Sequence, residues 1–171
     1  MRFDSKSTPA LAVAGLLTAA LIGLSGCGSD TDSAPEPEST PTATLDVVAQ
    51  GFDSLAELSD YVAQSLYGVE VSLESETNPD FNEETEPERL HVDFASDENR
   101  AQDMEATALI VQATSQAAFD YDILMVTGDV SAGEWSYLYD RSTVEELTAG
   151  GHIVVADIWD SAEQSFDTIH R

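Results

Sequence analysis

Residues 76–88 are the segment best suited to binding a cation. Six of these 13 residues are acidic, and Asn78, Asp80, Asn82 and Glu84 alternate as oxygen ligands do in calcium-binding loops. The stretch lacks the glycine and the final bidentate glutamate that an EF-hand loop requires. Asp80, Asn82 and Glu84 are therefore only weak metal candidates, and the favoured interpretation is a solvated acidic loop between two strands.

Trp135, Tyr137 and Tyr139 alternate along one predicted strand, so they share a face. If that face were exposed, it would form a possible ligand platform on which a sugar ring or a peptide could stack; if it is buried, it is core packing. On the opposite face only Leu138 is large and apolar. Burial of the aromatic face is therefore the favoured interpretation.

The sequence shows no motif for nucleophilic or nucleotide chemistry. Patterns of the GxSxG, GxGxxG and GxxxxGK[ST] types are missing. His91, His152 and His170 lie in distant segments without HExxH spacing, and ordinary surface histidines are the favoured interpretation. His91 is predicted on the solvent-exposed face of its strand, with Glu70, Ser72 and Glu74 on the same face of the neighbouring strand, where it could titrate near neutrality or bind zinc weakly. We assign no catalytic residue and no cofactor, and we expect a protein that is not an enzyme.

The charge of the chain excludes several kinds of partner. Its 171 residues include 33 acidic and only 6 basic ones, which gives a formal net charge of −27. Affinity for phosphates depends on Lys and Arg, so we expect no nucleic-acid binding and no attraction to anionic lipid headgroups. The single cysteine permits neither an internal disulfide nor a cysteine-based zinc cluster.

The N-terminus has the pattern of a secretory signal peptide. Arg2 and Lys6 precede an uncharged apolar run over residues 10–24. This run is shorter than the roughly 20 residues that span a bilayer core. A retained transmembrane helix is therefore the less favoured alternative.

The run ends in Leu24, Ser25, Gly26 and Cys27, which resemble a bacterial lipobox. The resemblance is to a class of sorting signals and covers only the first 27 residues. It implies cleavage before Cys27 and acylation of that residue, with a diacylglycerol thioether and a further acyl chain such as palmitate. Two acyl chains give stable anchoring, so the resemblance implies a lipoprotein on the extracytoplasmic side of the cell membrane.

A tether without large apolar side chains follows the cysteine. Residues 28–44 contain only Gly, Ser, Thr, Pro, Ala, Asp and Glu, a composition typical of disordered linkers. We therefore expect a signal peptide over 1–26, a lipidated cysteine and linker over 27–45, and one folded domain over 46–171. Cleavage would leave 32 acidic residues, four arginines and no lysine. This composition resembles that of secreted lipoproteins of actinobacteria.

Hydrophobic periodicity predicts an α+β domain. Helices are expected over 54–67, where Ser54 is the N-cap, and over 96–119, where Ser96 is the N-cap. A short helix is expected from Ser142 to Gly150, and a terminal one from about Asp157. Strands are expected over 69–74, 89–94, 121–127 and 134–139, and residues 152–156 are left open. We expect a small, mainly antiparallel sheet of two hairpins, with a long central helix and terminal helices packed on one face.

Together these patterns favour a lipid-anchored binding or accessory domain of the bacterial cell envelope. Its partners would be the membrane, through the lipid, and an envelope protein. The alternative is a lipoprotein that binds a small ligand or a divalent cation. The high content of acidic residues has two explanations: adaptation to a salty exterior, or only the solubility of a tethered domain. The sequence alone does not distinguish them. It also leaves the oligomeric state open.

Overall fold

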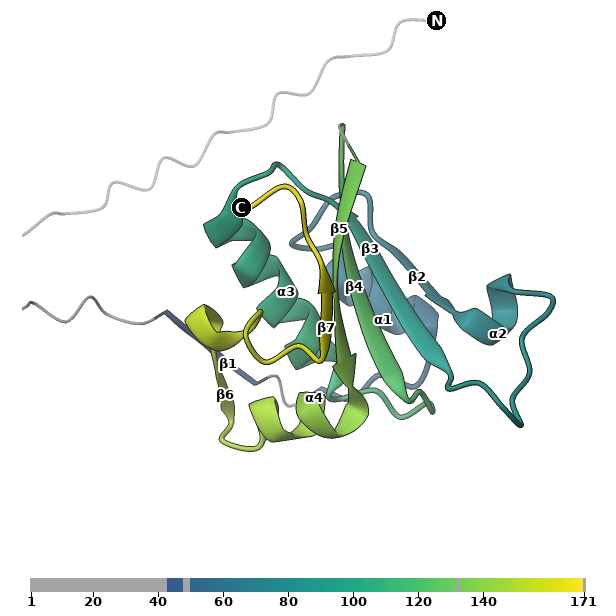
Figure 1. The fold of residues 1–171 in the computed structure, drawn as a ribbon. Coiled ribbons are helices and arrows are strands. Elements are labelled where there is room, and N and C mark those ends of the chain that lie inside the picture. Colours follow the sequence, from purple (N-terminus) through teal and green to yellow (C-terminus); the bar gives the residue numbers. More distant parts are fainter. Residues whose placement is uncertain (1–42, 48–49, 132, 171) are drawn as a thin grey trace, which may run out of the picture. The chain divides into compact units, whose positions relative to one another are not determined.

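The computed structural model describes residues 43–47, 50–131 and 133–170, all of which belong to one compact unit (Figure 1). The predicted leader, the lipobox with Cys27, and most of the predicted linker lie outside the described residues. In the described part of the chain, no helix is long and apolar enough to cross a membrane.

A five-stranded mixed sheet forms the centre of the fold, with the strand order β2-β3-β4-β5-β7. Both predicted hairpins, β2 with β3 and β4 with β5, are confirmed as antiparallel pairs. β3 and β4 are parallel, because the long helix between them returns the chain to the same end of the sheet. The α+β prediction is confirmed. The strands are Glu70–Leu73, Arg89–Ala95, Ile123–Val130, Gly133–Asp140 and Gln164–Phe166.

One face of the sheet makes the core. Register aligns Leu90, Leu124 and Tyr139 in one row across β3, β4 and β5. Val92, Val126 and Tyr137 form the next row, and all six side chains are buried. In the next row Gly128 stands between Phe94 and Trp135. A Cβ at this glycine would overlap the Trp135 indole, so the indole occupies the space that glycine leaves free.

Helix α3 spans Arg100–Thr114 and packs beside β4 (Figure 1). The prediction of a helix from Ser96 to Phe119 is wrong at both ends. Asn99 is the N-cap, because its side-chain oxygen accepts hydrogen bonds from the backbone N–H groups of the first turn. The hydroxyl of Ser96 is instead bound to Asp103, inside the helix.

The other helices are shorter. α1 spans Leu55–Val62, α2 spans Glu74–Thr77 and α4 spans Arg141–Thr148. The Ser54 cap of α1 is confirmed, since its hydroxyl accepts the N–H of Glu57, although α1 ends well before the expected residue 67.

The C-terminal part differs most from the prediction. β6, His152–Val154, pairs with β1, Thr44–Asp46, in a separate two-stranded sheet. Residues 152–156, which the sequence left unassigned, are therefore partly a strand. Because β1 includes Thr44, the fold begins inside the expected linker. The expected terminal helix is wrong. A 3-10 turn, Val155–Asp157, is followed by β7, which pairs with the edge of β5. The apolar residues whose spacing suggested a terminal helix include Ile158 and Trp159, which are buried although they lie in a turn.

Candidate functional site: an acidic cleft beside a buried histidine

The aromatic stripe is buried and is not a ligand platform. Trp135 and Tyr139 are fully buried and Tyr137 nearly so. The rings of Trp135 and Tyr137 pack with Trp159, which stacks flat on Tyr137 at a centroid distance of 4.7 Å. The platform interpretation is therefore wrong. The structure shows the favoured interpretation, core packing, because these rings lie on the face of the sheet that the helices cover.

The acidic segment uses its oxygen atoms to fold its own backbone. The side-chain oxygen of Asn82 accepts the N–H of Glu84, and that of Asn78 accepts the N–H of Asp80. Among the residues that the structure describes, no three His, Cys, Asp or Glu side chains are grouped so that they could hold a metal ion. The weak metal candidates Asp80 and Glu84 are thus not part of such a group.

His91 and Glu74 form a pair, as their shared wet face suggested. His91 Nε2 lies 2.8 Å from a Glu74 oxygen. A hydrogen bond from Asn78, followed by the one from His91, holds the pKa of Glu74 below its usual value. Burial raises the pKa of Asp93 on the same strand. The pair links α2 to β3, and both side chains are engaged in this local contact.

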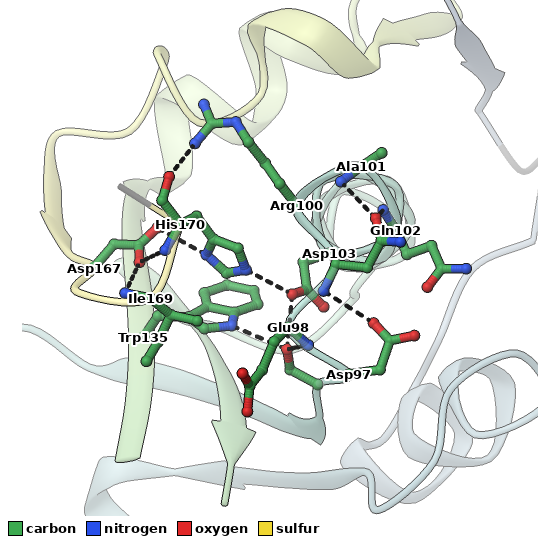
Figure 2. Close-up of polar contacts among 12 residues, drawn as sticks. Asp97, Glu98, Arg100, Ala101, Gln102, Asp103, Trp135, Asp167, Ile169 and His170 are labelled. Atoms are coloured by element: carbon green, nitrogen blue, oxygen red, sulfur yellow. Dashed lines mark hydrogen bonds and ion pairs between the residues drawn. The ribbon is translucent and has the colours of Figure 1, made fainter. Parts of the chain in front are cut away.

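The interpretation of His170 as an ordinary surface histidine is wrong, because its side chain lies inside a polar cluster (Figure 2). Its ring lies between two carboxylates: Nε2 is 2.9 Å from Asp103 Oδ2, and Nδ1 is 3.0 Å from Asp167 Oδ2. The side chains of His170 and Asp103 are only 1% and 3% exposed. Each ring nitrogen thus has a carboxylate oxygen as its partner, and the two contacts fix the orientation of the ring.

Neighbouring groups complete this His170 cluster, which we define as Ser96, Asp103, Asp167 and His170. The rings of Trp135 and Trp159 pack against the His170 ring at centroid distances of 5.5 and 5.0 Å, in edge-on and tilted geometry. Burial alone would raise the pKa of Asp167, but hydrogen bonds from the backbone of His170 and Ile169 hold it below its usual value.

A serine, an aspartate and a histidine in contact raise the question of a hydrolase. In a catalytic triad the histidine lies between the serine and the carboxylate and removes the serine proton. Here Asp103 lies between them, because Ser96 Oγ donates to Asp103 Oδ2 at 2.7 Å. Ser96 Oγ also accepts from the Trp135 indole. This order differs from that of a catalytic triad, and the contacts join the end of β3 to α3 and the C-terminal segment.

A cleft of about 550 Å³ opens beside this cluster. The end of β3, the first half of α3, the segment after α1 and strand β1 form its walls. Leu45, Leu66 and Leu109 supply apolar surface, and Tyr67, at the rim, is 87% exposed. An exposed tyrosine over an apolar floor is typical of a binding surface.

The polar side of the cleft is acidic. Asp97, Asp103 and Glu105 line it, and no basic residue is among the lining residues that the structure describes. Both hydrogen bonds that the Asp103 carboxylate makes within the described residues use Oδ2. Asp103 as a whole is only 2% exposed. The cleft thus combines apolar surface with two exposed acidic side chains and one that is almost entirely buried.

Comparison with known proteins gives no relative for this chain. No family model matches it, and neither a curated protein nor a solved structure matches it significantly.

Proposed function

We propose that this protein is a lipid-anchored binding or accessory domain on the extracytoplasmic side of a bacterial cell membrane, and that the cleft is its binding site. The anchor is supported by the lipobox-like residues 24–27 and by the tether that follows them. If the residues that follow Cys27 form the disordered linker that their composition predicts, they would give a reach of roughly 20–30 Å, and the domain would meet envelope proteins near the membrane surface.

The cleft is the observation on which the binding proposal depends. Its volume of about 550 Å³ lies in the range of ligand-binding pockets, which are mostly apolar with a few polar groups. Asp103 provides such a group, and the exposed Tyr67 at the rim offers contact area to a partner. An envelope protein is the partner that we favour, since the domain is held at the membrane.

Membrane fractionation tests the anchor. Replacement of Cys27 by Ala removes the acylated residue, so the variant should leave the membrane fraction. Ser39→Ala, which alters the tether and keeps the cysteine, is the matched control and should stay with the membrane. A Cys27→Ala variant that remains bound after a salt wash would show that an uncleaved helix or a protein partner holds the chain.

In-cell photo-cross-linking tests the binding site. Amine-reactive reagents are unsuitable, because the mature chain would contain no lysine. A photo-reactive residue at Tyr67 should give a discrete adduct whose partner is identified by mass spectrometry. The same residue at Phe166, which is 58% exposed and does not line the cleft, should not. Adducts of equal yield at both positions, or none at Tyr67, would contradict the proposal.

A small-ligand lipoprotein is the second candidate, and the volume of the cleft is the observation that favours it. If Tyr67 captures no protein, this alternative takes precedence. Ligand screening by thermal shift of the full chain would then be the next measurement, since a ligand that binds only the folded state raises the melting temperature.

A further inference from the structure

We propose that residues 164–170 form a strap that opens as a unit from the rest of the domain, with the His170 ring as its latch and the loss of carboxylate charge in acid as its trigger. The strap consists of β7 and the turn that follows it, and it lies along β5 and ends beside α3 (Figure 1). This movement goes beyond the proposed binding function.

The strap has little apolar attachment to the domain. All three residues of β7 are exposed, and they include Phe166. Ile169 is only partly buried against the core. β7 pairs with residues 136–138 alone, whereas β5 is eight residues long. Segments with few buried apolar contacts open at a lower free energy than the core does, so the strap can leave while the rest of the sheet stays folded.

Glu163 fixes the point at which the strap begins. Its backbone N–H donates to the carbonyl of Leu138 at 3.0 Å. Its carboxylate accepts hydrogen bonds from the backbone N–H of Asp140 and from the hydroxyl of Thr143. These bonds hold Glu163 against β5 and α4, so the movement of the strap starts after this residue, which is the hinge.

Polar contacts hold the far end of the strap (Figure 2). The His170 ring contacts Asp103 of α3 and Asp167 of the strap itself. The hydroxyl of Tyr137, on β5, donates to Asp167 at 3.0 Å, and Arg100 of α3 donates to the backbone carbonyl of His170. Because these contacts take the place of apolar burial, the protonation of their groups decides whether the strap is closed.

Acid removes a charge that favours the closed strap. Burial raises the pKa of Asp167, but hydrogen bonds from the backbone of His170 and Ile169 outweigh this effect and hold that pKa below its usual value. The closed strap therefore favours the ionised carboxylate. This contribution is complete above the ordinary pKa of the group and is lost as the pH falls through the lowered one.

Other titratable groups also face the latch. Arg100 stays charged in acid, and the hydroxyl of Tyr137, whose pKa burial raises, stays protonated. Protonation of the His170 ring adds a donor toward the carboxylates and so favours the closed strap. Asp103 is an acceptor for that ring, and Asp160, in the turn before the strap, adds negative charge near Tyr137. Protonation of the carboxyl groups is therefore the change that opens the strap.

Opening exposes both tryptophans of the chain. Trp135 and Trp159 pack against the His170 ring, both are buried in the closed form, and the chain has no other tryptophan. Opening also frees the outer edge of β5 at residues 136–138, whose backbone groups then lack a partner strand. The closed strap thus covers aromatic surface and a sheet edge, and tryptophan fluorescence reports its position.

Acrylamide quenching of tryptophan fluorescence tests the strap on the purified full chain with Cys27→Ala. Quenching should increase severalfold between about pH 6 and pH 3, while the far-ultraviolet circular dichroism of α3 and the sheet stays unchanged. In His170→Gln the same increase should be present at neutral pH. His152→Gln, an exposed histidine on β6, should behave as wild type. Loss of both signals in a single transition would overturn the proposal.

A disulfide between the strap and β5 provides the matched control. Ser136 and Phe166 are Cα partners in adjacent antiparallel strands, a separation that a disulfide spans. The Ser136→Cys, Phe166→Cys double variant should show no increase of quenching in acid when oxidised, and the wild-type increase when reduced beforehand. Equal quenching of the two forms in acid would show that the strap does not open. The His170→Gln comparison remains decisive if the double variant does not fold.

Discussion

The Nε2 atom of His170 lies 2.9 Å from Oδ2 of Asp103, 67 positions earlier in the chain. This contact joins the C-terminal segment to α3. It also connects two regions with different roles, because Asp103 belongs both to the buried His170 cluster and to the lining of the cleft. A change in either region therefore acts on the other through one carboxylate.

Loss of the His170 ring should destabilise the fold. His170→Gln cannot keep both contacts that the ring makes with Asp103 and Asp167, and it removes the packing of the ring against Trp135 and Trp159. A buried polar group that loses its partner costs about 1–3 kcal/mol, which urea unfolding should detect. His152→Gln is the control: His152 is exposed, and surface substitutions change stability by about 0.5 kcal/mol or less. Equal effects of the two would contradict a structural role for the His170 ring.

The lowered pKa of Asp167 predicts a loss of stability in acid. A carboxyl whose folded pKa lies below its ordinary value of 3.8 favours the folded state fully above that value, and the contribution is lost as the pH falls through the folded pKa. At neutral pH, wild type should be more stable than Asp167→Asn. The difference should narrow below about pH 4. Asp60→Asn, on the exposed side of α1, controls for the loss of charge, and a difference that does not change with pH would contradict the prediction.

Local patterns predicted the elements whose causes are local. The Ser54 cap and the alternation of apolar residues along β3 depend on neighbours in the sequence, and both were confirmed. β7 was missed because three exposed residues carry no apolar pattern and the strand exists only by pairing with β5. Residues 152–154 form a strand for the same reason, since β1 lies more than 100 residues away in the sequence.

The candidate site could not be predicted, because its partners are distant in sequence. The cluster joins the end of β3, α3 and the C-terminal segment. Two weak signals were present. Asp103 lies three and four positions before the buried Ala106 and Thr107, so it shares the buried side of α3. Asp167 and His170 have the spacing of a local ion pair. No sequence pattern indicated the cleft, because its walls come from four separate segments of the chain.

The close approach of Gly128 and Trp135 predicts a specific intolerance to a methyl group. In Gly128→Ala the new Cβ would overlap the indole, which is fully buried and cannot move without disturbing Trp159. Overpacking of this kind costs about 1–3 kcal/mol, measurable by urea unfolding, and should change near-ultraviolet circular dichroism. Gly51→Ala is the matched control, because its Cβ would meet only a carbonyl at 3.7 Å. Similar costs at both sites would show that the indole is not held rigidly.

The net charge predicts that salt stabilises the fold. The expected mature chain has 32 acidic residues against four arginines, and the three described arginines already have partners. The remaining carboxylates repel one another across the surface, which lowers stability at low ionic strength. At 1 M salt the screening length falls to about 3 Å, so the melting temperature of the full chain should rise steadily from low salt to 1 M. Sodium and potassium chloride should act equally if screening is the cause. A melting temperature indifferent to salt would overturn adaptation to a salty exterior and leave solubility as the role of the acidic residues.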